Sequence, residues 1–508
     1  MKGKVYLIGA GPGDPGLITV KGLECIRDAD VLVYDYLAPP ALLDCARKDA
    51  EIIYVGKKGG AHTLSQEKIN ALLVEKAGKG FRVARLKGGD PFIFGRGGEE
   101  AEELVRSNIP FEVVPGVTSA IAAPAYAGIP LTHRQFTSTV AFVTGHEDPG
   151  KEVSGIDWEA LAKGIGTLVF LMGIKNLPKI TEQLTRHGMP PETPAALVRW
   201  GTTVNQETVT GTVATISDAA QQAGITAPAV IVIGGVVGLR DTLKWYENRP
   251  LFGKRIVVTR ARAQASELVR ELAGLGAECV ESPTIEVVPV RDPKPLDDAI
   301  ESLATYDWIV FTSVNGVSVF FDRLFEKGRD VRALGNIRTA CIGPATAERL
   351  RSFGFRSDLL PENYLAESIV DAFGRESIRG KKILIPRAET ARPVLPEQLS
   401  KMGAIVNVVA VYETREVRQD ADMLIRRLRE HSVDLVTFTS SSTVKNFKSL
   451  LPEEEFEALM KEVTVAAIGP ITADTARGLG FGVHIVADTY TIPGLVEAIL
   501  KKYRDAGI

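Results

Sequence analysis

Three glycine-rich segments in the first half of the chain follow apolar runs and carry polar side chains. They are GAGPGDPGL (Gly9–Leu17), RLKGGDPFIFGRGGEE (Arg85–Glu100) and PGVTSAIAAPAYAGIPLTH (Pro115–His133). Glycine at a strand end permits a tight turn and lets a ligand approach the backbone. The first segment departs from the dinucleotide fingerprint G-x-G-x-x-G, because its sixth position is Asp14 and Pro12 has no amide donor. It fits a flat, uncharged ligand part such as adenosine better than a pyrophosphate, and a plain glycine turn is the alternative.

The second half of the chain offers hydroxyl groups rather than strong nucleophiles. Thr312 and Ser313 follow one apolar run, and residues 439–442 follow another. The segments IGPATA and IGPITA put Thr346 and Thr472 at the expected N-termini of matching helices, where backbone amides can bind carboxylates. Because Ser and Thr before a helix are most often N-caps, capping alone is the more common explanation for each hydroxyl taken singly.

The pattern of apolar and amphipathic segments around these residues predicts an α/β fold. Short runs such as KVYLIGAG, DADVLVYD, KRIVVTRA, DWIVFTS and DLVTFTS alternate with longer amphipathic segments along the chain. Continuous Val, Ile and Leu strands bounded by glycine and separated by helices predict parallel α/β sheets. In such sheets ligands bind at the carboxyl ends of the strands, where the glycine-rich and hydroxyl-bearing segments stand.

An internal duplication organises the second half. KRIVVTRA returns as KKILIPRA, and DWIVFTSVNGVSVFF returns as DLVTFTSSSTVKNF, at an offset near 127 residues. Two copies are too few for a solenoid, so we expect two similar α/β lobes that face each other across a cleft. A break near LKWYENRPLFGKR, with Pro250 and Gly253, predicts domains at 1–245 and 253–508 joined by a linker at 246–252.

Composition excludes several functional classes. The 508 residues include 60 Lys and Arg against 63 Asp and Glu, so no basic excess recruits nucleic acid. The four cysteines and six histidines are scattered, which argues against a disulfide framework and a metal site and favours the cytoplasm. The longest apolar stretch is well below the ~18 residues that a membrane helix needs, so we expect no membrane association.

The first half resembles a known family. GAGPGDPGL, YDYL, VGKKG, RLKGGDPFIFGRGGEE, PGVTSA, GIPLTHR, TGH, LMG and TAPAVIVIGG, in this order over about 1–240, resemble uroporphyrinogen-III C-methyltransferases of the tetrapyrrole methylase family. The resemblance implies a two-lobed α/β fold, S-adenosylmethionine bound between the lobes, and a homodimer. It also implies two successive methylations of uroporphyrinogen III that give precorrin-2, without a metal.

The same resemblance assigns residues by motif. It implies that Asp35 and Lys57 form an acid/base pair, with a surface ion pair as the plainer reading. Uroporphyrinogen carries eight carboxylates, so cations in the matching motifs are expected to bind it: Arg85, Lys87, Arg96 and Arg134. The expected contacts to the methyl donor are Pro12, Gly88, Gly89, Asp90, Ile93, Thr118, Ser119, Met172, Gly201 and Ala227, with Pro228 a weaker candidate.

The second half, over about 253–508, resembles uroporphyrinogen-III synthase through its layout: VTRA, VYETR, FTSSS and IGP-x-TA. The resemblance implies cyclisation of hydroxymethylbilane with inversion of the last ring and loss of water. Tyr412 matches the tyrosine proposed to assist departure of the hydroxyl, since a phenol can donate a proton. The expected substrate contacts are Thr312, Ser313, Thr346, Ser440, Ser441 and Thr472.

Together the two halves imply a bifunctional cytoplasmic enzyme that converts hydroxymethylbilane to precorrin-2, for sirohaem or cobalamin synthesis. One alternative keeps the first-half fold but changes the substrate to another corrin position or to RNA. Another makes the second half a non-catalytic, two-lobed module that only binds a tetrapyrrole.

Overall fold

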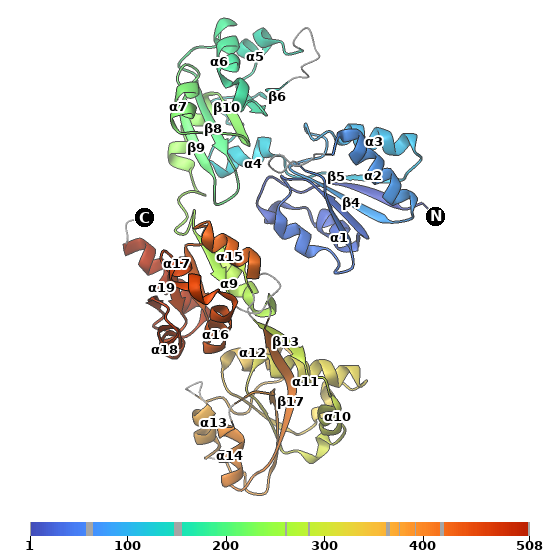
Figure 1. Cartoon of the computed structure of the whole chain (residues 1–508), viewed down its shortest axis with the longest axis vertical. Coiled ribbons are helices and arrows are strands. Elements are labelled where there is room, and N and C mark those ends of the chain that lie inside the picture. Colours follow the sequence, from blue (N-terminus) through green and yellow to red (C-terminus); the bar gives the residue numbers. More distant parts are fainter. Residues whose placement is uncertain are drawn as a thin grey trace. The chain divides into compact units, whose positions relative to one another are not determined.

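The computed structural model describes residues 2–56, 64–146, 155–259, 262–282, 285–361, 366–374, 376–391, 393–416 and 421–505. The chain, drawn in Figure 1, divides into two compact units. Unit 1 comprises Met1–Arg255, Glu271–Glu278 and Leu500–Ile508, and unit 2 comprises Ile256–Arg270 and Cys279–Ile499.

The first sheet of unit 1 is parallel, with strand order β3-β2-β4-β1-β5. Its strands are β1 (Lys4–Gly9), β2 (Val31–Tyr34), β3 (Glu51–Tyr54), β4 (Arg82–Lys87) and β5 (Phe111–Val114). Alternate residues of β4 point to opposite faces, so Val83 packs on α2 (Gln66–Gly78) and α3 (Gly97–Arg106), whereas Leu86 packs on the side of α1 (Val20–Asp28). Helices therefore cover both faces, as expected for a parallel sheet.

The second sheet of unit 1 is mixed, with strand order β6-β7-β10-β8-β9. Its strands are β6 (Val140–Thr144), β7 (Thr167–Leu171), β8 (Pro194–Arg199), β9 (Glu207–Thr212) and β10 (Ala229–Ile233). Only β6 and β7 run parallel, so the prediction of parallel sheets is wrong here. The interior strands are buried on both faces, and a continuous apolar run does not reveal the direction of the neighbouring strand.

Helices cover both faces of this sheet as well. Residues of α6 (Leu177–Arg186) and α7 (Ile216–Gln222) pack on one face, with α5 (Trp158–Gly164) beside them. The small side chains of α4 (Ser119–Tyr126) pack on the other face. A short helix, α8 (Arg240–Leu243), follows β10.

Two further sheets belong mainly to unit 2, in the orders β12-β11-β18-β19-β20 and β13-β17-β16-β14-β15. The first contains β11 (Arg255–Val258), β12 (Glu278–Glu281), β18 (Leu435–Phe438), β19 (Thr464–Ala467) and β20 (Val483–Val486). The second contains β13 (Ile285–Pro289), β14 (Trp308–Phe311), β15 (Arg338–Cys341), β16 (Lys382–Ala388) and β17 (Ile405–Glu416).

Helices accompany each of these sheets along the chain. The sheet that contains β11 and β18 is accompanied by α9 (Arg262–Gly274), α15 (Ala421–Arg429), α16 (Ser441–Leu450), α17 (Phe456–Met460), α18 (Pro470–Gly478) and α19 (Ile492–Asp505). The sheet that contains β14 and β17 is accompanied by α10 (Lys294–Glu301), α11 (Val314–Glu326), α12 (Pro344–Ser352), α13 (Ala366–Phe373) and α14 (Val394–Lys401).

The duplication predicted from the sequence is confirmed, with an exchange of strands between the copies. In one sheet Ile256 pairs with Leu435, and in the other Ile383 pairs with Trp308. Ile383 is the equivalent of Ile256, and Leu435 is the equivalent of Trp308, each at an offset of 127 positions. The first strand of each copy therefore lies in the sheet that the other copy builds. The two lobes are similar, but neither lobe is one continuous repeat.

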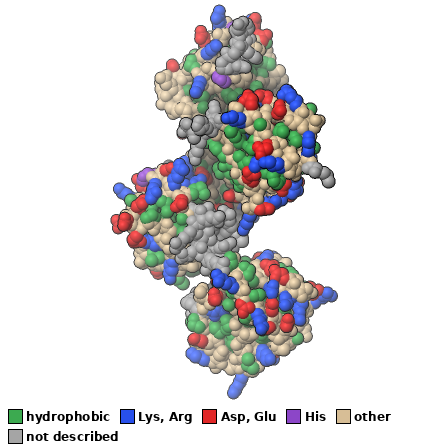
Figure 2. All heavy atoms as spheres, turned by 45° about the vertical axis from the view of Figure 1, so that its right-hand side comes forward, with side chains coloured by type: hydrophobic (Ala, Val, Ile, Leu, Met, Phe, Trp, Pro, Cys, Tyr) green, Lys and Arg blue, Asp and Glu red, His purple; other side chains and the backbone are tan. Residues whose placement is uncertain are grey.

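Acidic and basic side chains lie intermingled on the face drawn in Figure 2, in keeping with the near balance of charges in the sequence. Among the described residues, no helix has both the length and the apolar character required to cross a membrane.

Candidate active sites

A cavity of about 740 Å³ lies in unit 1. Its walls come from the segments that follow β1, β2 and β4 in the first sheet, from the start of α4, and from the segments at the ends of β7, β8 and β10 in the second. Most of these segments follow strand carboxyl ends, as the α/β pattern predicts, whereas residues 227–230 lie at the amino end of β10. The volume suits a small organic ligand.

The residues expected to contact the methyl donor all line this cavity: Pro12, Gly88, Gly89, Asp90, Ile93, Thr118, Ser119, Met172, Gly201 and Ala227, together with Pro228. Gly89 has φ of +71°, in the left-handed region that favours glycine, and exchanges two backbone hydrogen bonds with Gly11. At Gly201 packing alone requires glycine, since a Cβ atom would lie 2.4 Å from the Cβ of Ala123.

The carboxylate of Asp90 organises the loop after β4. Its Oδ1 accepts hydrogen bonds from the backbone amides of Phe92 (2.8 Å) and Ile93 (3.1 Å), and its Oδ2 accepts one from Gly116 (2.9 Å). The side chain thereby ties the second glycine-rich segment to the third, and both segments contribute to the cavity wall.

Sequence reasoning missed several residues of the cavity wall. Tyr36 and Trp200 contribute aromatic rings whose centroids lie 6.1 Å apart, and His146 and Lys175 also line the cavity. Tyr36 directly follows Asp35 and Trp200 directly precedes Gly201, so their positions beside predicted site residues were the available signal.

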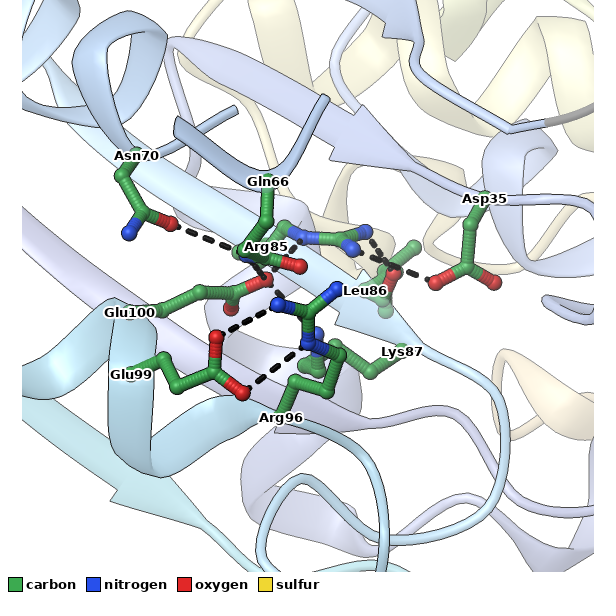
Figure 3. A network of polar contacts seen from close by, with 9 residues as sticks. All are labelled: Asp35, Gln66, Asn70, Arg85, Leu86, Lys87, Arg96, Glu99 and Glu100. Carbon is green, nitrogen blue, oxygen red and sulfur yellow. Dashed lines mark hydrogen bonds and ion pairs between the residues drawn. The ribbon is translucent and has the colours of Figure 1, made fainter. Parts of the chain in front are cut away.

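Asp35 lines the cavity and belongs to a network of charged groups behind its wall (Figure 3). Its Oδ1 accepts from the amide of Leu37 (3.2 Å), and its Oδ2 accepts from Nη2 of Arg85 (3.2 Å). Glu100 Oε1 accepts from Nε of Arg85 (3.3 Å) and from Nζ of Lys87 (2.7 Å). Burial, and next the charge of Arg85, lower the pKa of Lys87 below its usual value, whereas Glu100 acts in the opposite direction.

The remaining cations predicted for this half lie elsewhere. Arg96 is exposed and paired with Glu99, at 2.6 Å between Nη2 and Oε2, and Arg134 is also exposed. Neither residue lines the cavity. Lys57, the predicted partner of Asp35, lies outside the described residues.

A second candidate site surrounds Tyr412 in β17. The Tyr412 side chain is 7% exposed, and its hydroxyl oxygen lies 3.0 Å from Oγ of Ser313. Ser313 caps α11 by accepting a hydrogen bond from the amide of Gly316 (3.0 Å). Thr312 precedes Ser313, and Thr346 is buried in the first turn of α12, so the structure collects these residues in one sheet and its helices.

The other predicted hydroxyls belong to the sheet that contains β18 and β19. Ser440 caps α16, Ser441 Oγ lies 2.8 Å from Thr475 Oγ1, and Thr472 is buried in α18. Capping therefore accounts for both Ser313 and Ser440, in addition to any role toward a ligand.

Arg387, near the end of β16, is a residue that sequence reasoning missed at this site. It is buried, and burial lowers the pKa of its guanidinium although the nearby Tyr412 acts in the opposite direction. The next residue, Ala388, pairs with Tyr412 in the sheet. The equivalence of Arg260 and Arg387 in the duplication was the only sequence signal.

Comparisons with known proteins match both halves. Residues 4–217 match the family "Tetrapyrrole (Corrin/Porphyrin) Methylases", and residues 266–497 match the family "Uroporphyrinogen-III synthase HemD".

Three relatives illustrate the similarity. A porphyrin biosynthesis protein HemD of Ruminiclostridium josui is 40% identical over 503 residues, which cover 98% of each chain. An S-adenosyl-L-methionine-dependent uroporphyrinogen III methyltransferase of Methanosarcina barkeri is 56% identical over 241 residues, 47% of this chain and 94% of that protein. A sirohaem synthase of Pseudomonas putida is 54% identical over 246 residues, 48% of this chain and 53% of that protein. The chain thus belongs to the tetrapyrrole methylase family through its first half and to the uroporphyrinogen-III synthase family through its second.

Proposed function

We propose that this chain makes uroporphyrinogen III from hydroxymethylbilane with its second half and methylates that product twice with its first half, giving precorrin-2. The observation that carries the proposal is the cavity of unit 1, in which all the expected donor-binding residues meet Asp35. The presence of both families in one chain supports it, because the product of the second half is the substrate of the first.

The cavity fits S-adenosylmethionine as the methyl donor. Gly89 leaves room beside its backbone, where a Cβ atom would have no neighbour closer than 3.6 Å. Ile93, Leu171 and Val198 offer apolar walls to a flat heterocycle, and Ser119 and Lys175 add polar groups. The Methanosarcina barkeri relative, which is named for its dependence on S-adenosylmethionine, supports the same donor.

The donor supplies an electrophilic methyl group on a sulfonium, and an electron-rich carbon of the tetrapyrrole forms the new C–C bond as the S–C bond breaks. The residues of the cavity align the two reactants, which supplies most of the rate in such a displacement. Asp35 accepts the proton that the methylated ring must lose, with Lys57 as the proposed partner. Lys87 at the cavity wall binds a carboxylate of the substrate, and Arg96 and Arg134, which are exposed outside the cavity wall, bind carboxylates that extend beyond it.

In the synthase half, Tyr412 donates a proton to the departing hydroxyl group of the bilane. The contact between Tyr412 and Ser313 supports this role, because it holds the phenol oxygen at the end of β14, where Thr312 and Ser313 stand. Thr346, Ser440, Ser441 and Thr472 bind carboxylates of the flexible chain. The carbon that loses the hydroxyl forms the ring-closing C–C bond with a pyrrole carbon, and the proton that this pyrrole carbon loses restores the phenol. The released water consists of the hydroxyl and the donated proton.

Separate assays of the two activities test the proposal. Under anaerobic conditions, hydroxymethylbilane alone should give uroporphyrinogen of the III isomer. Uroporphyrinogen III with S-adenosylmethionine should gain the mass of two CH2 groups, since each added methyl group is accompanied by loss of one proton. Formation of only the I isomer, as in spontaneous cyclisation, would remove the synthase activity. Absence of any mass gain would remove the methyltransferase activity.

We also propose a homodimer formed through the methylase half. The exposed rings of Phe136 and Phe142 in unit 1 offer apolar area for such a contact. Light scattering of the full chain should give the mass of two chains at micromolar concentration, and the mass of one chain would refute the proposal.

A further inference from the structure

Glu100 is the common acceptor of a buried cluster of charges beside the cavity (Figure 3). The side chain lies in the first turn of α3 and is fully buried. Its Oε1 accepts hydrogen bonds from Lys87, Arg85 and Gln66 Nε2 (3.2 Å), so two cations share one carboxylate oxygen. Lys87 lines the cavity, and Arg85 holds Asp35, which lines it too.

We infer that Glu100 is a positioning residue for methyl transfer, which orients Asp35 through Arg85 and holds an ammonium group at the cavity wall through Lys87. This inference rests on the proposed methyltransferase function. Glu100 itself does not line the cavity, so it acts only through the two cations.

The hydrogen bonds of Arg85 link Glu100 to Asp35 and leave it no role in binding the substrate. Its side chain is 3% exposed and is absent from the cavity wall. Nε faces Glu100, Nη1 donates to the backbone oxygen of Leu86 (2.7 Å), and Nη2 donates to Asp35. A guanidinium presents its donors in a rigid fork, so three acceptors in different directions fix its plane. The Asp35 oxygen is therefore held by a group whose own orientation depends on Glu100.

The cluster also sets the charge of Lys87. Two carboxylates, Glu100 from α3 and Asp35 after β2, favour the ammonium form, whereas burial and Arg85 on the same strand oppose it. Glu99, in the first turn of α3, is a further charged neighbour. Loss of the charge at Glu100 removes one of the two carboxylates, so Lys87 should lose its proton at a lower pH than in the native protein.

The substitution Glu100→Gln tests the inference, because it removes the charge and preserves the shape. Glu102→Gln on the same helix is the control, since that side chain is 70% exposed. We expect Glu100→Gln to lower kcat for methylation of uroporphyrinogen III by the full chain about tenfold or more. The Kd for S-adenosylmethionine should stay within about twofold, because the donor-binding loops are unchanged.

The dependence of kcat on pH separates positioning from general destabilisation. The alkaline limb of the profile should move to lower pH in Glu100→Gln and stay in place in Glu102→Gln. A Glu100→Gln enzyme with native kcat and a native profile would overturn the inference. If the native chain does not methylate uroporphyrinogen III at all, the proposed function fails, and the inference fails with it.

Glu100→Gln could fail to fold, because the side-chain NH2 of the glutamine could occupy the place of Glu100 Oε2, which is buried and has no hydrogen-bond partner among the described residues. A second variant, Arg85→Lys, then tests the inference. Arg85→Lys keeps a cation beside Glu100 but cannot reach Glu100, Leu86 and Asp35 together. We expect a folded protein that binds the donor normally and has a kcat reduced at least about tenfold. Native kcat in Arg85→Lys would refute the bridge between Glu100 and Asp35.

Discussion

The hydroxyl oxygen of Tyr412 lies 3.0 Å from Oγ of Ser313, although 99 positions separate the two residues in the chain. Ser313 is held in turn by the amide of Gly316 at the start of α11. The phenol is thus oriented by a hydroxyl that the helix cap fixes. A positioned phenol is what a general acid requires, because the proton must be within reach of the leaving group.

Tyr412→Phe should slow formation of the III isomer by ~10²–10⁴-fold, since that is the usual loss when a positioned general acid is removed. The fold should persist, because the ring still fills its place in the core around β14 and α11. The assay must measure the III isomer rather than total porphyrin, since the bilane also cyclises spontaneously without ring inversion.

Tyr306→Phe is the matched control for this prediction. The hydroxyl of Tyr306 likewise contacts a polar side chain, because it accepts a hydrogen bond from Asn407, but Tyr306 lies outside the predicted site. The Tyr306→Phe variant should form the III isomer at the native rate. If Tyr412→Phe does so too and only its Tm is lower, Tyr412 serves packing, and the hydroxyls of Thr312, Ser313 and residues 439–442 become the next candidates.

Asp90→Ala should weaken binding of S-adenosylmethionine. The carboxylate accepts three backbone hydrogen bonds that join the second and third glycine-rich segments. Without these bonds part of the binding free energy must order the loops that line the cavity, so we expect a roughly tenfold rise in Kd. Calorimetry measures this Kd directly. Asp49→Ala, at an exposed ion pair, is the control, and equal affinities in the two variants would contradict the prediction.

Binding of the methyl donor should not depend on a metal ion. Among the residues that the structure describes, no three or more His, Cys, Asp or Glu side chains lie close enough together to bind a metal ion. Protein treated with a chelator should bind S-adenosylmethionine with the same Kd as untreated protein in calorimetry. Lost affinity that returns when a divalent ion is added would contradict this expectation.

Glu247 should make unit 1 sensitive to acid. Burial alone would raise the pKa of Glu247, but hydrogen bonds from Arg240, Gln206 and Thr208 outweigh it and lower the pKa below the usual value. A carboxyl with a depressed pKa adds stability above its unfolded value, about 4.3, and that stability is lost as the pH falls through the folded value.

Thermal unfolding of native protein and of Glu247→Gln, measured from pH 7 down to pH 3, tests this linkage. At pH 7 the variant should be less stable by roughly 3 kcal/mol, because Arg240 loses a buried partner. Below pH 4 the difference in Tm should shrink as the native carboxyl becomes protonated. A difference that stays constant across the range would show that Glu247 does not titrate in this way.

The proposed boundary at 246–252 can be tested by separating the halves. A fragment 253–508 should cyclise hydroxymethylbilane, because it retains both sheets of the second half with their cores. We expect it to be less stable than the full chain, since Leu251 is buried and its amide donates to the backbone oxygen of Leu275 (2.9 Å). An insoluble or inactive fragment, beside an active full chain, would show that the halves do not work independently.

The residues that line the cavity could be assigned from the sequence because they lie in motifs that resemble those of a known family. In the parallel first sheet of unit 1 these motifs follow strand ends that meet at one edge. Asp35 and Asp90 are examples. Arg85 could not be placed correctly from the sequence. Its charge and its position in a motif predicted a substrate contact, but in the structure its side chain is buried and donates a hydrogen bond to Glu100 of α3. The antiparallel direction of β8 and the exchange of β11 and β16 between lobes depend on long-range pairing, which apolar periodicity does not encode.

The most direct test of the account is a single anaerobic reaction of the full chain with hydroxymethylbilane and S-adenosylmethionine carrying an isotopically labelled methyl group. The product, analysed by mass and by isomer, should be a type III tetrapyrrole with two labelled methyl groups. Omission of the donor should stop the reaction at unmethylated uroporphyrinogen III. Unlabelled product of the I isomer in the complete reaction would contradict the claim that one chain carries both activities.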